Sequence, residues 1–258
     1  MVELPKLPEC IDKTLTNLAD DPSKAIGKTI RDLYDLVLGS RVAFAAEKKK
    51  IKYAHDLEEY RKSLERNVDA IPEDKYIEPS MQIAAQSLVD SQYCLDTEEL
   101  REMFAKLIAR SMHADYSNRI HPTFSKLLQQ LSPLDAQILT FFSASGVHSG
   151  LPIANIVGYD ESRMKKITCA TNIPAYLPDR CSTKDAARSI VVLLHLGIVY
   201  IPDNTYLCGE GHYDHFTQSE EFMFYQQLHE PQGYAMEIEK RVAHLTPLGI
   251  DFVSVCLG

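Results

Sequence analysis

Residues 95–110 read LDTEELREMFAKLIAR, the most regularly patterned segment of the N-terminal half. Its apolar side chains recur at intervals of three and four residues, the spacing that places them on one face of an α-helix. They are Leu100, Met103, Phe104, Leu107 and Ile108. Asp96 or Thr97 is suited to cap this helix, because a short oxygen-bearing side chain accepts from the unpaired N–H groups of the first turn. We therefore expect a helix that organises the core, with Phe104 and Leu107 in the interior.

Two prolines mark the helices that follow. Pro122 stands in His121-Pro122-Thr123-Phe124, and Pro133 follows Ser132 about ten residues later. Proline suits the first position of a helix, since its missing N–H would be unpaired there. An apolar stripe follows Pro133, so the sequence predicts a helix over residues 133–144. Successive helices with short joints are typical of a helical bundle.

Three segments, taken in this order, resemble the abortive-infection alpha family. Residues 100–109, LREMFAKLIA, are similar to that family's "L-R-E-x-x-A-x-L-L-A" run. Residues 121–124, HPTF, and 131–136, LSPLDA, are similar to its "H-P-S-F" and "L-S-P-x-E-A" segments. The resemblance implies bacterial phage defence through a domain of poorly defined biochemistry. It carries over no catalytic residue.

The N-terminal half is expected to contain one long helix. After a short helix over residues 11–18, a second stripe begins at Ile26 and runs through a polar collar to Val68, just before Pro72. This pattern predicts one long helix or two nearly collinear ones. Such length exceeds what a compact core needs, so part of it is expected to serve a partner, a second copy of the chain included.

The C-terminal half is predicted to resemble a winged helix. Ser182 and Asp185 form a capping box that opens a helix ending at Gly197. A hairpin over residues 198–207, a strand over 238–245 and a last helix after Thr246-Pro247 follow, with residues 159–180 as an irregular connection. The expected fold is mainly α: a helical domain over 1–131, then a winged-helix-like α+β domain over 132–258 with a small β-hairpin.

Composition narrows the classes of function. Residues 1–131 carry 19 basic and 22 acidic side chains, and residues 132–258 carry eight basic and 14 acidic ones, which together give the net charge of −9. Neither half is basic, which argues against tight nonspecific binding to nucleic acid. No run of apolar residues is long enough to span a membrane, and the first residues lack the layout of a signal peptide. We expect a cytoplasmic protein whose six cysteines are reduced thiols.

The densest group of metal-ligating residue types is Cys208, His212 and His215. Thiolate and imidazole suit zinc, and Cys169 or Cys181 is available as a fourth ligand. The paired-cysteine spacing of zinc modules is missing, however, so a polar loop is the favoured interpretation and no metal or cofactor is expected. Residues 145–150, SGVHSG, have the residue types of a nucleophile site, but not the strand-to-helix elbow that positions a catalytic serine.

The resemblance and the charge pattern favour a defence protein that binds a phage or host component and is not an enzyme. The first alternative is a nucleic-acid-binding regulator that uses the helix over residues 183–196. That helix offers only Lys184 and Arg188, with His195, against Asp185, whereas phosphate contacts normally need several cations. A metal-dependent nuclease is a second alternative, because acidic residues are plentiful.

Overall fold

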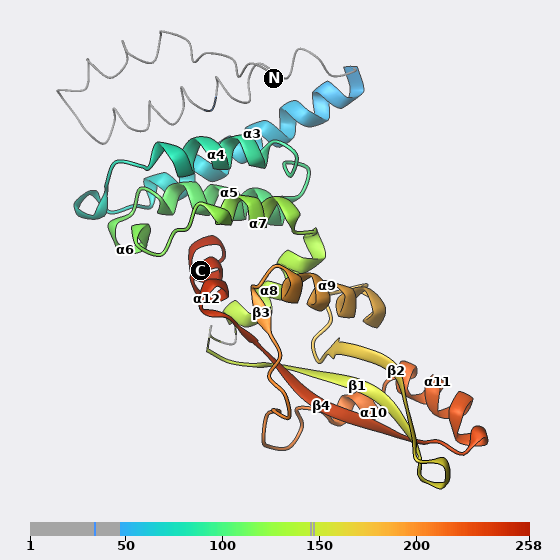
Figure 1. Cartoon of the computed structure of the whole chain (residues 1–258). Helices are drawn as coiled ribbons and strands as arrows, with labels where there is room; N and C mark the ends of the chain where they lie inside the picture. The colour runs from blue at the N-terminus through green and yellow to red at the C-terminus, as the bar shows by residue number, and fades with distance from the viewer. Residues whose placement is uncertain (1–33, 35–46, 145, 147) are drawn as a thin grey trace, which may run out of the picture. The chain divides into compact units, whose positions relative to one another are not determined.

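The computed structural model describes residue 34 and residues 47–144, 146 and 148–258 (Figure 1). The helix expected over residues 11–18 and, apart from Tyr34, the part of the long helix from Ile26 to residue 46 lie outside these residues. The chain divides into two compact units, Met1–Gln129 and Gln130–Gly258, which are described in turn.

The described part of the first unit is helical. Its elements are α3 (Glu47–Asp69), the short 3-10 helix η3 (Glu73–Lys75), α4 (Met81–Ser91), α5 (Glu98–Arg110), α6 (Ala114–Ser117) and α7 (Thr123–Gln130). The long helix is therefore confirmed from Glu47 onwards, and it ends before Pro72 as the sequence predicts. In Figure 1, α5 runs alongside α3 and α4, against which it packs. Phe104 and Leu107 of α5 have no exposed surface, which confirms the predicted stripe.

The second unit is α+β. Its elements are α8 (Pro133–Ala144), β1 (Leu151–Asp160), η4 (Glu161–Arg163), β2 (Lys165–Pro174), α9 (Thr183–His195), β3 (Val199–Tyr200), α10 (Asp214–Thr217), α11 (Glu220–His229), η5 (Glu230–Gln232), β4 (Ala235–Leu245) and α12 (Pro247–Cys256). The strands form one antiparallel sheet in the order β2-β1-β4-β3. In Figure 1 the long strands β1, β2 and β4 run side by side. Among the described residues, no helix has both the length and the apolar character needed to cross a membrane.

The sheet corrects the prediction of a mainly helical chain with a small hairpin. The long β1–β2 hairpin occupies residues predicted to be partly irregular, because β2 runs over Lys165–Pro174. The hairpin expected over 198–207 does not form: β3 pairs instead with the far end of β4, where Val199 lies opposite Leu245. Nearly every residue of the central strand β1 is buried, so its sequence lacks the alternation that identifies a half-exposed strand. The chain is therefore mixed α+β.

Two bulges in β2 explain why its sequence does not alternate either. The register with β1 shifts after Ala154 and again after Ile156, and each shift leaves one extra residue in β2. At the first bulge Asn172 adopts a left-handed conformation with φ of 57°, which asparagine tolerates better than most residues. Its backbone N–H donates to Oδ1 of Asn155 at 2.9 Å, so a side chain takes the place of the interrupted ladder. The bulges bend and twist the hairpin.

The start of α12 is fastened to the segment before β3. Thr246 caps the helix by accepting from the backbone N–H of Gly249 at 2.9 Å, and its hydroxyl donates to the carbonyl of Gly197 at 2.6 Å. The N–H of Thr246 donates to the carbonyl of Ile198 at 3.0 Å. The helix predicted to follow Thr246-Pro247 is thereby confirmed, and the backbones approach closely because position 249 has no Cβ.

Candidate functional site

Helix α11 presents apolar side chains to solvent. Met223, Phe224 and Leu228 are 44%, 59% and 47% exposed. Phe224 and Leu228 are four residues apart and lie on one side of the helix, and Met223 is exposed next to Phe224 in the chain. We call these three residues the α11 face. Exposed apolar groups of this size, clustered on one helix, mark interaction surfaces more often than isolated ones do.

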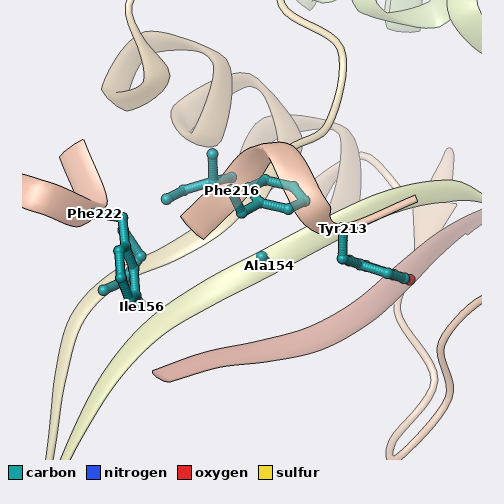
Figure 2. Close-up of a cluster of buried hydrophobic side chains, with 6 residues drawn as sticks. Ala154, Ile156, Tyr213, Phe216 and Phe222 are labelled. Atoms are coloured by element: carbon teal, nitrogen blue, oxygen red, sulfur yellow. The ribbon is translucent and has the colours of Figure 1, made fainter. Parts of the chain in front are cut away.

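The opposite side of α11 is anchored to the sheet by a buried cluster (Figure 2). Phe222 enters this cluster from α11, and Tyr213 and Phe216 enter it from the residues of α10 and its N-cap. They pack against Ala154 and Ile156 of β1. Because α11 is fixed on its inner side by this core, its outer side is held in a defined position.

Aromatic rings continue from the α11 face to the end of the helix. Phe224 and Tyr225 meet edge to face with ring centroids 5.3 Å apart, and Tyr225 stacks on His229 at 6.3 Å. His229 in turn meets the edge of Tyr234 at 6.1 Å. Burial and the nearby charge of Glu221 raise the pKa of Tyr225, so its hydroxyl stays neutral at physiological pH. These contacts suit recognition by apolar and ring surfaces, the chemistry of protein-interface anchors.

The residues weighed as metal ligands do not converge. Cys208 is exposed, His212 lies near Gly209 within its own loop, and the ring of His215 packs on Phe216 with centroids 4.1 Å apart. Burial lowers the pKa of His215, although Asp214 opposes this effect. In the described ranges no three His, Cys, Asp or Glu side chains are grouped so that they could hold a metal ion.

The loop around these residues is held instead by Tyr213, which the sequence analysis did not single out. Its hydroxyl donates to the carbonyl of Arg241 at 2.7 Å and accepts from the N–H of Leu207 at 3.1 Å. Burial raises the pKa of Tyr213, which keeps the donating proton in place. A tyrosine between a glycine-rich loop and a strand is the only sequence signal for this role, and it is a weak one.

The candidate nucleic-acid contacts lie on the outer side of α9. Lys184 and Arg188 are exposed one turn apart, followed by Val191, which is 49% exposed. Arg188 pairs with Asp185 at 3.1 Å, and this pairing reduces the positive potential of the helix. The N-terminus of α9 confirms Ser182 as the N-cap: its Oγ accepts from Asp185 N–H at 3.1 Å and donates to Asp185 Oδ2 at 2.7 Å.

Residues 100–109, the first of the three segments that carry the family resemblance, hold α5 against α3. The carboxylate of Glu102 accepts from Ser63, from Arg66 at 2.6 Å and from Asn67 at 3.1 Å, all on α3. Burial acts to raise the pKa of Glu102, but these hydrogen bonds and the charge of Arg66 outweigh it, so the pKa lies below its ordinary value. Arg101 donates to the carbonyl of Leu95 at 2.5 Å. The role of the segment in this fold is therefore structural.

The other two segments begin helices. His121 Nδ1 accepts from the N–H of Thr123 at 3.2 Å where α7 starts, and Phe124 behind it is fully buried. Ser132 and Asp135 bond reciprocally where α8 starts, with Ser132 N–H donating to Asp135 Oδ2 at 2.7 Å. Both arrangements satisfy N–H groups that a helix leaves unpaired at its first turn.

Comparison with known proteins agrees with the family resemblance that the three segments carry. No curated protein and no solved structure matches the chain. The family model described as abortive infection alpha matches residues 52–256, which include all three segments and most of both units. With this extent of match, the chain belongs to the abortive infection alpha family.

Proposed function

We propose that this protein defends a bacterial cell against phage by abortive infection, and that it acts in the cytoplasm by binding a phage or host protein and not by catalysis. Membership of the abortive infection alpha family suggests the defence role. The observation that supports binding is the α11 face, with Met223, Phe224 and Leu228 on a helix whose other side is anchored in the core.

The chemistry of the α11 face favours a protein partner. Phe224 is 59% exposed and already touches Tyr225, so a partner gains a preformed aromatic anchor with little loss of side-chain freedom. Glu220 stands at the start of the same helix, where it suits a basic residue at the rim of an apolar contact. A phosphate backbone would meet no cation on α11.

The test replaces the α11 face without disturbing the core. The double variant Phe224→Ser and Leu228→Ser should keep a melting temperature within a few degrees of the unmodified chain, because both side chains are largely exposed. It should lose plaque reduction in infected cells. Met164→Ser is the matched control, since Met164 is 94% exposed at the far end of the β1–β2 hairpin.

Full protection by the double variant at unchanged protein level would refute the α11 face as the site of action. Loss of protection in the Met164 control as well would show that any exposed apolar change is harmful, and it would remove the support for α11. Cross-linking from Phe224 during infection, followed by mass spectrometry, identifies the bound component.

A winged-helix nucleic-acid-binding regulator is the second candidate. It would use α9 as the recognition helix, with Lys184 and Arg188 on phosphates. The observation in its favour is that both side chains are exposed on one side of α9. The pairing of Arg188 with Asp185 and the net charge of −6 over residues 132–258 rank it below protein binding. A metal-dependent nuclease ranks third, since it needs carboxylates that converge on a metal ion.

A further inference from the structure

Strand β4 has an outer edge that the short strand β3 covers at one end. On its inner side β4 pairs with β1 over residues 235–243 without a register shift. On its outer side β3 pairs only with His244 and Leu245 (Figure 1). If this register continued, Pro202 would come opposite Val242, and a proline has no N–H with which to extend the ladder. Before Val242, no strand of the described chain lies beside this edge.

The backbone groups that point out of this edge belong to the even-numbered residues of β4. The N–H of Ala175 donates to the carbonyl of Pro152 at 2.8 Å, so the even-numbered residues of β1 direct their backbone groups to β2. Its odd-numbered residues direct theirs to the odd-numbered residues of β4, because odd lies opposite odd in that register. The N–H of Thr246, which donates to the carbonyl of Ile198 at 3.0 Å, shows that even-numbered residues face outward.

Met236, Ile238 and Lys240 therefore present a row of outward N–H and C=O groups, which we call the β4 edge. Along the described part of the chain, these groups make no backbone hydrogen bond on the outer side. The side chains of Met236 and Ile238 are half-buried, and that of Lys240 is exposed. Lysine often blocks a strand edge, but the ammonium group of Lys240 lies 5.5 Å from the ring centroid of Tyr213. The β4 edge can thus accept an added strand.

The other edge of the sheet is protected. The edge strand β2 carries two bulges, which interrupt the even spacing of its backbone groups. Helix α9 also packs against β2. Bulges and covering helices are the means by which proteins keep strand edges from pairing. Since β4 has a regular register and no bulge, it is the edge at which this sheet can be extended.

The side chains beside the β4 edge indicate which strand fits. Glu237 and Glu239 lie on one face of β4, where Glu237 is exposed and Glu239 pairs with Lys166 at 3.1 Å. Met236 and Ile238 lie on the other face and pack against the cluster under α11. Residues directly opposite each other in an antiparallel pair share a face of the sheet. A basic residue therefore suits the position opposite each glutamate, and an apolar one suits the position opposite Ile238.

We propose that the β4 edge binds an extended segment of a partner protein in which basic and apolar residues alternate, added antiparallel to β4. A second copy of this chain fits less well. If Ile238 paired with Ile238 of another copy, Glu237 of each chain would lie opposite Glu239 of the other, and like charges in that position are destabilising. A basic segment reverses the sign of these two contacts, and the net charge of −9 attracts it.

Fluorescence anisotropy of the full chain with the labelled peptide SKVKVKSG tests the proposal. We expect a dissociation constant between about 1 and 100 µM, since a short flexible peptide must be ordered on binding. The peptide SEVEVESG should not bind. N-methylation of both valines should abolish binding, because their N–H groups donate to β4. N-methylation of the first and last lysines should change the dissociation constant by less than about threefold, since those N–H groups point away from β4.

Glu237→Lys supplies the matching change in the protein. It should raise the dissociation constant at least about tenfold, because it places like charges opposite each other. The control is Glu73→Lys on the 3-10 helix η3, an exposed acid whose replacement changes the net charge equally and should alter the dissociation constant by less than about threefold.

Three outcomes would overturn the proposal. The first is no binding of SKVKVKSG up to about 1 mM. The second is binding that survives N-methylation of the valines, because the peptide would then be held by charge alone and not as an added strand. The third is equal weakening by Glu237→Lys and Glu73→Lys, which would mean attraction to the whole acidic chain. The assay contains no phage component and leaves the α11 face unchanged, so its failure leaves the α11 proposal standing.

Discussion

Leu107 shows how much a single buried residue contributes to this fold. It has no exposed surface and lies on the α5 stripe that packs against α3 and α4. Leu107→Ala should lower the free energy of unfolding by roughly 2–5 kcal/mol, because apolar contact is lost and a cavity remains. Lys106→Ala, on the neighbouring position, should cost much less, up to about 1 kcal/mol, because Lys106 is only partly buried and a charged side chain that still reaches water contributes little. Urea unfolding of the two variants measures both values.

The outcome at Leu107 also separates a core role from a binding role. If Leu107→Ala leaves the melting temperature unchanged but abolishes phage protection, α5 is a partner-binding helix and not the centre of the core. The burial of Leu107 argues for loss of stability first, with protection falling in proportion to the amount of folded protein.

Glu102 links folding to pH. Its pKa in the folded chain lies below the ordinary value, because Ser63, Asn67 and Arg66 favour the ionised form against the effect of burial. Stabilisation by Glu102 is therefore complete above its unfolded pKa of about 4.3 and is lost as the pH falls through the folded pKa. Glu102→Gln should be less stable than the unmodified chain at pH 7, and the difference should shrink towards about pH 3.

Chemical unfolding across this pH range provides the measurement for Glu102. The exposed Glu98 at the start of the same helix supplies the control Glu98→Gln. A difference between the unmodified chain and Glu102→Gln that stays constant with pH would mean that the Ser63–Asn67–Arg66 contacts do not depend on the charge.

At the scale of elements, Gly249 decides how α12 joins the sheet. A Cβ at this position would lie 2.0 Å from the carbonyl oxygen of Ile198, a backbone atom that moves only if β3 or α12 shifts. Gly249→Ala should therefore destabilise the chain by about 1–3 kcal/mol or more, although alanine is the better helix former. Stability of Gly249→Ala equal to the unmodified chain would contradict this close approach.

Elements with local signals could be predicted from the sequence. The stripe of α5, the Ser182 cap of α9 and the Thr246-Pro247 start of α12 each depend on residues a few positions apart. The β1–β2 hairpin depends on contacts that the sequence does not reveal locally. Because β1 is buried on both faces, its sequence does not alternate between apolar and polar residues. In β2 the two bulges interrupt such alternation. The return strand expected at Thr205–Leu207 was wrong because β3 finds its partner about 45 residues later, at Leu245.

The candidate site likewise depends on contacts between distant parts of the chain, which the sequence does not reveal. Residues 222–225, FMFY, are all apolar or aromatic, so their order does not indicate which side chains are buried. Only the packing separates Phe222, which is 7% exposed, from Phe224, which is 59% exposed. The residue types that bind metals directed attention instead to Cys208, His212 and His215. Such types can be read from a sequence, whereas the distances between the side chains in the fold cannot. The described structure does not bring these three together with a further ligand into a metal site.

At the scale of the whole molecule, charge is the property that constrains partners most. Both halves of the chain are acidic, with net charges of −3 for residues 1–131 and −6 for residues 132–258. Some basic side chains already pair with acidic ones: Lys126 with Asp90 at 2.7 Å, and Lys166 with Glu239 at 3.1 Å. Association with a polyanion must therefore overcome a repulsive field with few cations.

This balance leads to a prediction for DNA. The purified chain should bind a random duplex no more tightly than about 1 µM at physiological salt, because neutralising phosphates with Lys and Arg supplies nearly all nonspecific affinity. The variant Lys184→Ala and Arg188→Ala should leave this weak binding almost unchanged, and the dependence on salt should be shallow. Fluorescence anisotropy at several salt concentrations measures both. Sub-micromolar binding that falls steeply with salt and disappears in the double variant would place α9 on DNA. The order of the two candidate functions would then be reversed, because an acidic unit would be holding a polyanion through the two cations of one helix.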